Sequence, residues 1–404
     1  MAVPGGTPTN QAAPPAGARS SQPRPGTAGT APPPSTAAAG TKVPVAVGTV
    51  ATLSGPVGAF VKDSIFSVSV WTKWINGRGG VNGHPVRHIV ADDGGDPARY
   101  NASVRQLVEE QGVVAFLFNT IGLAGGDLSY VSQKRVPIIG HEAGTEEAYG
   151  NAMVFTPYPS GLTYAYGLIA GFAQAVVPQG KTKLATVACS DVKLCDLFDR
   201  TWNGPAAKEL GFENVYRARP SLTQPDYTAE CLSARQKGAQ VILGAIDNNS
   251  YLRLAHACAR QNYKPVIGVA DQLALPSVAA DPAMDGNVVI TKVAPWPDTS
   301  VPGTAELHQA FAQVASGVHV NGAHAGGWVT AKTFEAAARN LPDPPTSADV
   351  LDGLWAIDGD TLGGMTFPLT FAKDQPSPRR ACWGLALIQD RKFVPPANGK
   401  LKCK

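Results

Sequence analysis

Acidic residues and histidines are the side chains of this chain most able to do acid–base or metal chemistry, but their spacing matches no catalytic pattern. Asp92, Asp93 and Asp96 form a short acidic run, in which we expect Asp96 to cap the helix that starts at Pro97. The seven histidines are scattered and form no H-E-x-x-H pair. Gly180-Lys181-Thr182 has Ala175 where a phosphate-binding loop needs glycine. We therefore predict no catalytic residue, metal site or cofactor, and keep an enzyme as an alternative.

The six cysteines are the next candidates for chemistry. They contain no Cys-x-x-Cys pair, and no histidine lies beside them at zinc-like spacing. Disulfides fit this pattern better than metal, and they persist in an oxidising compartment. We expect sequential pairing, with buried free thiols as the alternative. The expected pairs are Cys189 with Cys195, Cys231 with Cys258, and Cys382 with Cys403.

Residues 1–40 have the composition of a disordered linker. They contain no Leu, Ile, Phe, Tyr, Trp, Asp or Glu, so burial cannot offset the entropy of ordering them. A tether to a membrane anchor and a plain tail both fit this segment, and no signal peptide or membrane span is visible in the sequence. The chain carries a net charge of +3 with 16% charged residues and no Lys/Arg-rich run, which argues against a nucleic-acid partner.

The folded part begins at Val43, where β-branched and apolar residues take over. From there the pattern predicts strands that alternate with helices. A second series starts with a helix at 161–177 and includes a strand at 183–189 followed by a helix reaching Leu210. Strand–helix–strand crossovers require parallel sheets covered by helices on both faces. We therefore predict an α/β protein with two doubly wound units, which share the three helices and the β-rich sequence that follow residue 293.

Loops that directly follow strands are where ligands meet parallel sheets, because helix N-termini expose unpaired N–H groups there. In the first unit these loops are 53–58, 119–122 and 141–145. The side chains of Ser54, Asn119, Thr120 and Thr145 can donate hydrogen bonds to an anionic group, and helix capping is their alternative role. Glu142 and Ala143 of the third loop are also predicted ligand-binding residues.

In the second unit the corresponding loops are 190–194, 246–250 and 270–273. Their acids could pair with a ligand ammonium, or could instead be solvated or cap helices. Two aromatic residues at predicted crossovers could stack on a solute, with core packing as the alternative. The candidates are Asp191, Asp247, Asn248, Asp271, Tyr158 and Trp296.

Six segments are informative through their order and spacing: GTVATLSGPVGAF at 48–60, WINGRGGVNGHPV at 74–86, the sequence from Val90 to Phe118, KRVPIIG at 134–140, QPDYTAECLSARQKGAQVILGA at 224–245 and ARQNYKPVIGVADQ at 259–272. Together they resemble the type I periplasmic solute-binding proteins of the leucine/isoleucine/valine-binding family. The resemblance covers about residues 43–395. A departure is NTIGLAGGD at 119–127, where many amino-acid binders carry a serine-rich loop.

The resemblance implies two Rossmann-like lobes joined by three crossovers, with an interlobe cleft that closes on a solute. We expect residues 43–157 and 294–357 in one lobe, and 158–293 and 358–404 in the other. The implied function is capture of an amino acid, amide or related small carboxylic acid outside the cytoplasm, by a monomer that delivers it to the membrane permease of an ATP-driven importer. A ligand-sensing receptor or regulatory module of the same fold is the alternative.

Overall fold

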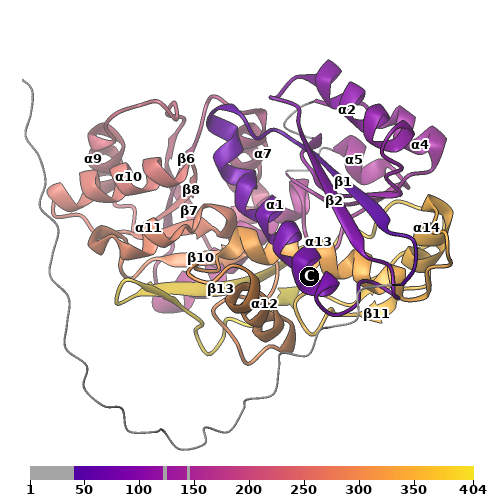
Figure 1. Cartoon of the computed structure of the whole chain (residues 1–404). Helices are drawn as coiled ribbons and strands as arrows, with labels where there is room; N and C mark the ends of the chain where they lie inside the picture. The colour runs from indigo at the N-terminus through magenta and orange to yellow at the C-terminus, as the bar shows by residue number, and fades with distance from the viewer. Residues whose placement is uncertain (1–40, 122–124, 143–145) are drawn as a thin grey trace, which may run out of the picture. The chain divides into compact units, whose positions relative to one another are not determined.

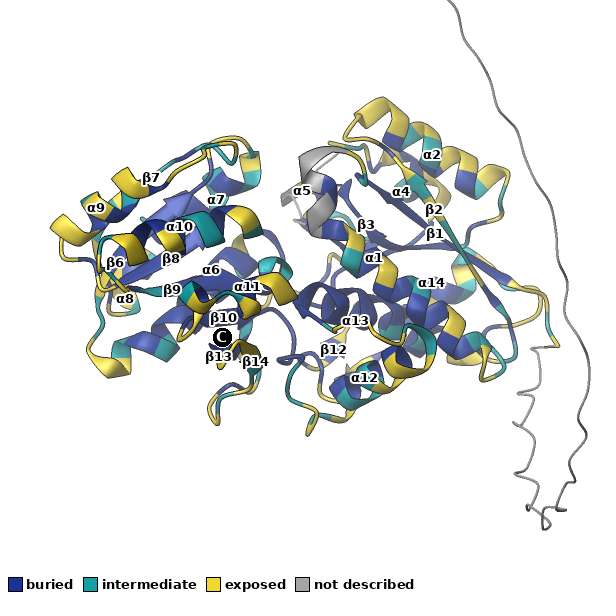
Figure 2. Cartoon of the chain, turned by 60° about the vertical axis from the view of Figure 1, so that its left-hand side comes forward, coloured by how far each residue is buried: buried dark blue, intermediate teal, exposed yellow. Residues whose placement is uncertain are grey.

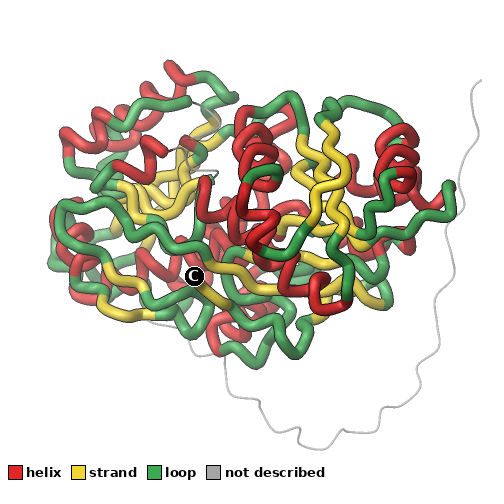
Figure 3. The backbone as a smooth tube through the Cα atoms, turned by 180° about the vertical axis from the view of Figure 1, so that it is seen from behind, coloured by secondary structure: helices red, strands yellow, loops and turns green. Residues whose placement is uncertain are grey.

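The computed structural model describes residues 41–121, 125–142 and 146–404. Residues 1–40, predicted to be a linker, lie outside the described residues. The strands form two large sheets, each wound with its own helices (Figure 1), and the view from behind shows the strands in separate groups (Figure 3). Within the described ranges, no helix combines the length and apolar character needed to cross a bilayer.

The first sheet is entirely parallel, in the order β2-β1-β3-β4-β5. Every residue of β1 is buried, which explains the unbroken apolar run in its sequence. The Asp96 side chain accepts a hydrogen bond from the backbone N–H of Arg99 and caps α2, as predicted. The elements are β1 (Val45–Ala51), α1 (Gly55–Asn76), β2 (Val86–Asp92), α2 (Pro97–Glu109), β3 (Ala115–Asn119), α4 (Ser129–Lys134), β4 (Ile138–His141), α5 (Glu146–Gly150) and β5 (Val154–Phe155).

The second sheet has the order β14-β13-β10-β9-β8-β6-β7, with β15 paired to β13. Strands β6 to β10 are parallel, and the C-terminal strands join antiparallel at β10. The elements are α6 (Gly161–Val176), β6 (Lys183–Ala188), α7 (Lys193–Trp202), α8 (Pro205–Glu209), β7 (Glu213–Ala218), α9 (Thr228–Gln236), β8 (Val241–Ala245), α10 (Asn248–Arg260), β9 (Val266–Ala270), α11 (Pro276–Ala280), β10 (Val288–Thr291), β13 (Cys382–Gln389), β14 (Lys392–Val394) and β15 (Lys402–Cys403).

The helix predicted to reach Leu210 is in fact two helices, and this prediction was wrong. Helix α7 ends at Trp202 and α8 starts at Pro205. Proline has no backbone N–H, and its ring collides with the preceding turn of a helix. Gly204 and Pro205 therefore stop α7, and the chain restarts in a new direction with Pro205 in the first turn of α8.

Helix α13 (Gly322–Ala337) links the two sheets, and almost all of its residues are buried (Figure 2). It packs along α1 and also contacts β3, β4 and the short 3-10 turn η2 (Asp271–Leu273) at the end of β9. A Cβ on Gly327 would lie 2.0 Å from the carbonyl oxygen of Ser64, so the two helices approach with no room for a side chain. The neighbouring helices are α12 (Pro302–Val314) and α14 (Ser347–Trp355).

The segment between α14 and β13 contacts the first sheet. It contains the small antiparallel pair β11 (Asp358–Asp360) and β12 (Leu369–Thr370). The Phe371 ring packs edge-on against Phe155 of β5 with centroids 5.2 Å apart, and Ser377 Oγ donates to the Val154 carbonyl at 2.9 Å. Since β13 then joins β10, this C-terminal part touches both sheets. The exact residues at which the lobes divide stay a prediction.

All three disulfides form with the predicted sequential pairing. The bonds join Cys189 to Cys195, Cys231 to Cys258, and Cys382 to Cys403. The second bond ties α9 to α10 on one face of the second sheet, and the third ties β13 to the C-terminal strand β15. The bridges therefore stabilise the second sheet and its surroundings.

We predict that the contribution of a bridge to stability follows the length of the chain it closes. Replacing both Cys231 and Cys258 with alanine opens a separation of 27 residues, against 6 for Cys189 and Cys195. Loop-closure entropy gives losses of about 3 to 4 and about 2 kcal/mol in the free energy of unfolding, respectively. Denaturant unfolding of the two double variants measures both, and a larger loss from the short bridge would contradict the prediction.

We also predict that Gly327→Ala destabilises the fold by about 1 to 3 kcal/mol, because its methyl group overlaps the backbone of α1. Gly77→Ala is the matched control. Gly77 follows α1 with φ of −63°, and a Cβ there meets its nearest neighbours at 3.5 Å. Equal midpoints of thermal unfolding for the two variants would show that the α1–α13 contact is looser than the structure has it.

Candidate ligand-binding site

A pocket lies where strands β6, β8 and β9 of the second sheet end. Its volume is about 90 Å³. Its wall is almost wholly apolar and is formed by the strand ends, by α6 and α7, and by the loop before α9. Glu142, at the end of β4, is the residue that the first sheet contributes. The other lining residues are Gly161, Tyr164, Leu168, Cys189, Val192, Leu194, Cys195, Phe198, Leu222, Gly244, Ala245, Ile246, Asp247, Ala270, Gln272 and Leu273.

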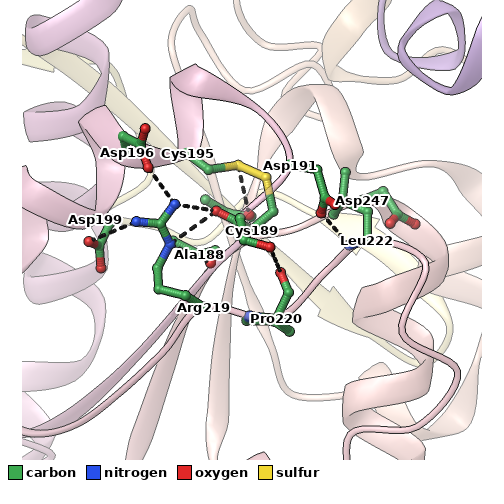
Figure 4. The surroundings of a disulfide bond; sticks show 12 residues. Ala188, Cys189, Asp191, Cys195, Asp196, Asp199, Arg219, Pro220, Leu222 and Asp247 are labelled. Atoms are coloured by element: carbon green, nitrogen blue, oxygen red, sulfur yellow. Dashed lines mark hydrogen bonds and ion pairs between the residues drawn. A yellow bond between two sulfur atoms is a disulfide. The ribbon is translucent and has the colours of Figure 1, made fainter.

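The Cys189–Cys195 disulfide forms part of this wall, and Arg219 holds it from behind (Figure 4). The Arg219 guanidinium donates to the Cys189 carbonyl at 2.7 Å and to the Ala188 carbonyl at 3.1 Å. The same group pairs with the buried carboxylate of Asp199 at 3.2 Å. With these contacts on one side and the covalent bridge on the other, the loop from 189 to 195 is fixed in position by the protein itself.

Polar groups from both sheets meet at one end of the pocket. Glu142 is 4% exposed. With its amide oriented so that the nitrogen faces Glu142, Gln272 of η2 donates to Oε1 at 2.6 Å and to Oε2 at 2.9 Å. This contact joins the end of β4 in the first sheet to the end of β9 in the second.

Asp271 is buried beside this contact and accepts three hydrogen bonds. Oδ1 accepts from the Tyr164 hydroxyl at 2.7 Å and from the Gln272 backbone N–H at 3.0 Å, and Oδ2 accepts from the Lys292 backbone N–H at 3.1 Å. Burial raises the pKa of Asp271, while the charge of Lys292 and the hydrogen bonds act in the opposite direction. The carboxylate thus connects η2, α6 and the chain that leaves β10.

Lys292 is 3% exposed and follows β10 directly. Its Nζ lies 4.6 Å from the centre of the Tyr158 ring and 5.6 Å from that of Tyr164. Burial and, secondly, the charge of Lys292 lower the pKa of His141 to about 4, so this neighbouring imidazole is neutral at pH 7. Lys292, two tyrosines, two acids and a neutral histidine therefore form a buried cluster, of which Tyr164 and Glu142 line the pocket.

Most of the first-unit candidates make hydrogen bonds to other residues of the first sheet and its loops. Ser54 Oγ donates to Asp92 at the N-terminus of α1. Asn119 is fully buried, with Oδ1 accepting from the Val50 N–H at 3.0 Å. Thr120 Oγ1 accepts from the Thr52 N–H at 2.8 Å. Glu142 lines the pocket, whereas Ala143 and Thr145 lie outside the described residues.

Among the second-unit candidates, Asp247 lies at the pocket, and Asp271 directly precedes its lining residue Gln272. Asp247 lines the pocket, but its carboxylate caps α10 by accepting from the Ser250 N–H at 3.0 Å, and Asn248 begins that helix. The exposed Asp191 accepts from the Leu222 N–H at 2.6 Å and holds a turn.

The two aromatic candidates have separate surroundings. Tyr158 is buried, and its hydroxyl hydrogen-bonds Thr330 Oγ1 at 3.2 Å while its ring faces Lys292. Trp296 is also buried and packs edge-on against Phe393 with centroids 5.0 Å apart. It lines a separate groove beside α11 and α12.

Tyr164, Gln272 and Lys292 are absent from the sequence-based list of site residues. A signal existed for Lys292, because it is a charge placed directly after an apolar strand. The apolar wall offered none, since Val192, Leu194 and Leu222 have the composition of ordinary core. Their position around a pocket appears only when the loops are folded.

Comparison with known proteins places the chain among binding proteins. The family model described as periplasmic binding protein matches residues 44–383. No curated protein sequence matches the chain.

Solved structures share the fold at low sequence identity. A possible leucine/isoleucine/valine-binding protein from Rhodopirellula baltica SH 1 has a TM-score of 0.70 at 15% identity, over 91% of this chain and 97% of that one. A fatty acid ABC transporter substrate-binding protein from Thermomonospora curvata has a TM-score of 0.67 at 19% identity, over 89% and 91%. An extracellular ligand-binding receptor from Verminephrobacter eiseniae ef01-2 has a TM-score of 0.67 at 17% identity, over 87% and 99%. With separately wound sheets and a family match over most of its length, the chain belongs to the periplasmic binding protein family and has the two-lobed type I fold.

Proposed function

We propose that this protein is the extracytoplasmic solute-binding component of an ATP-driven importer, and that it acts without catalysis. It captures a small organic solute, of the class of amino acids, amides and small carboxylic acids, and presents it to a membrane permease. The solute occupies the pocket at the ends of β6, β8 and β9.

The observation that carries this proposal is the composition of the pocket. Its side chains come from the carboxyl ends of three parallel strands, where ligands of α/β folds bind. An apolar wall with a few polar groups at one end is the usual makeup of a small-molecule site. Glu142 contributes from the first sheet, so a solute in this pocket touches both halves of the fold.

Because the solute contacts both halves of the protein, its binding changes how the halves are arranged, and the permease can recognise that change. A solute held by one sheet gains further contacts only when the other half approaches, and binding therefore shifts the population toward the closed form. The hydrogen bonds from Gln272 to Glu142 join the two sheets, so they form when the halves have come together. The three disulfides suit an oxidising compartment outside the cytoplasm.

We predict that filling the pocket weakens solute binding without unfolding the protein. Ala245→Leu places extra carbon atoms in the space between β8 and α7, and should weaken solute binding about tenfold or more. Ala229→Leu, on the exposed face of α9, is the matched control and should bind as the parent does. Calorimetric titration with a solute that was first identified by native mass spectrometry of the purified protein measures both.

Delivery to an importer is tested in cells. Uptake of the identified solute should fall when the chain is deleted and return with the parent protein or with Ala229→Leu, but not with Ala245→Leu. Unchanged uptake, with tight binding in vitro, would favour the ligand-sensing alternative. No stabilisation of the protein by any amino acid, amide or small carboxylic acid would overturn capture of this solute class.

A further inference from the structure

We infer that the solute is uncharged and has a short alkyl body, and that the pocket selects against carboxylates and ammonium compounds of the same size. This inference rests on the proposed function and narrows its solute class. Three observations support it: the apolar wall, the acids that stand in that wall, and the charges that act on one another in the cluster behind it.

The wall suits an alkyl group of modest size. Around the Cys189–Cys195 bridge, Leu168, Phe198 and other apolar side chains surround a volume of about 90 Å³. A cavity of about 150 Å³ is enough to bind benzene. The smaller pocket therefore suits a short or branched alkyl chain better than a larger ring, and each methylene buried there should strengthen binding about fourfold.

The charged residue types in the wall have one sign. Among the described residues that line the pocket there is no lysine, arginine or histidine, whereas Glu142 and Asp247 are both acids. A carboxylate that enters this pocket leaves water, meets no opposite charge in the wall and lies beside like charges. The wall therefore disfavours an anionic solute.

The same acids are poor partners for a cationic solute, because protein donors already occupy them. Asp247 accepts two hydrogen bonds from Ser250, at Oδ1 and at Oδ2. The amide nitrogen of Gln272 lies 2.6 and 2.9 Å from the two oxygens of Glu142. A solute ammonium would have to compete with these donors after giving up its own water, and that lowers the gain from pairing.

The charges of the buried cluster behind the wall act on one another. Burial raises the pKa of Asp271, while the charge of Lys292 and three hydrogen bonds from protein donors act to lower it. Tyr164 separates this cluster from the apolar wall, since it lines the pocket but directs its hydroxyl to Asp271. The cluster therefore calls for no counter-ion from a solute in the pocket.

An uncharged head group avoids the cost of burying an ion. Transfer of an amide or a hydroxyl out of water costs far less than transfer of a carboxylate or an ammonium. Its N–H or O–H can also share the Glu142 oxygens with Gln272, because a carboxylate has about four acceptor sites. Of two solutes with the same alkyl body, the pocket should therefore take the neutral one.

Two matched pairs test the inference: 4-methylpentanamide against 4-methylpentanoate, and 3-methylbutanol against 3-methylbutylamine. Leucine, which has a branched body of the same kind and both charges, completes the series. Calorimetry should show that each neutral compound binds about tenfold or more tightly than its charged counterpart, and that leucine binds about tenfold or more weakly than the amide. Equal or tighter binding of the acid, the amine or leucine would overturn the inference while leaving solute capture intact. If none of the five compounds binds, capture of this solute class at the pocket fails, and the inference fails with it.

Asp247→Asn tests the contribution of the wall charge. Asparagine caps helices about as well as aspartate, so α10 keeps its start while the wall loses an acid. The ratio of acid affinity to amide affinity should rise about threefold or more. Asp96→Asn, the same change at the cap of α2 in the first sheet, is the matched control and should leave the ratio unchanged. An unchanged ratio in a folded Asp247→Asn would contradict selection by the wall charge, and if this variant does not fold, the matched pairs still decide.

Discussion

The carboxylate of Asp271 is the contact on which the arrangement of the site depends. It lies at the end of β9, accepts from the hydroxyl of Tyr164 on α6, and accepts from the backbone where the chain leaves β10. A Cβ on Gly322 would lie 2.6 Å from the Asp271 side chain, so the start of α13 packs directly on it. Because one buried acid fixes three segments, the positions of Tyr164 and Lys292 are set together and not independently.

The site has two parts that are held in place by different interactions. The wall around the disulfide is held by covalent geometry and by Arg219, so its shape does not depend on a solute. The polar end is made by residues of both sheets, where Glu142 meets Gln272 and Lys292 lies against Tyr158. Burial of apolar surface against the wall would favour binding, whereas a charge that is buried without compensation costs far more than a missing methylene.

Much of the fold could be predicted from the sequence, and the site only in part. Apolar runs such as β1 and the Asp96–Pro97 helix start are local signals, and sequential pairing, the favoured one of several possible arrangements of the cysteines, is confirmed. Of the residues predicted in strand-end loops, Glu142 and Asp247 line the pocket and Asp271 precedes its lining residue Gln272, while their role in binding stays a prediction. The contacts of these side chains could not be predicted from the local sequence. Asn119 and Thr120 bond to the backbone of Val50 and Thr52, and the orientation of each strand-end side chain depends on neighbours far away in sequence.

The acids at the strand ends of the second sheet accept hydrogen bonds from the protein's own donors. A strand-end acid stands beside the N-terminus of the next helix, whose unpaired N–H groups compete for it, and Asp247 is used in this way by α10. A lysine in such a position can make no helix N-cap, because an ammonium has no acceptor to offer the N–H groups. Lys292 instead lies against the rings of Tyr158 and Tyr164, and where burial raises the pKa of Asp271, the charge of Lys292 acts to lower it.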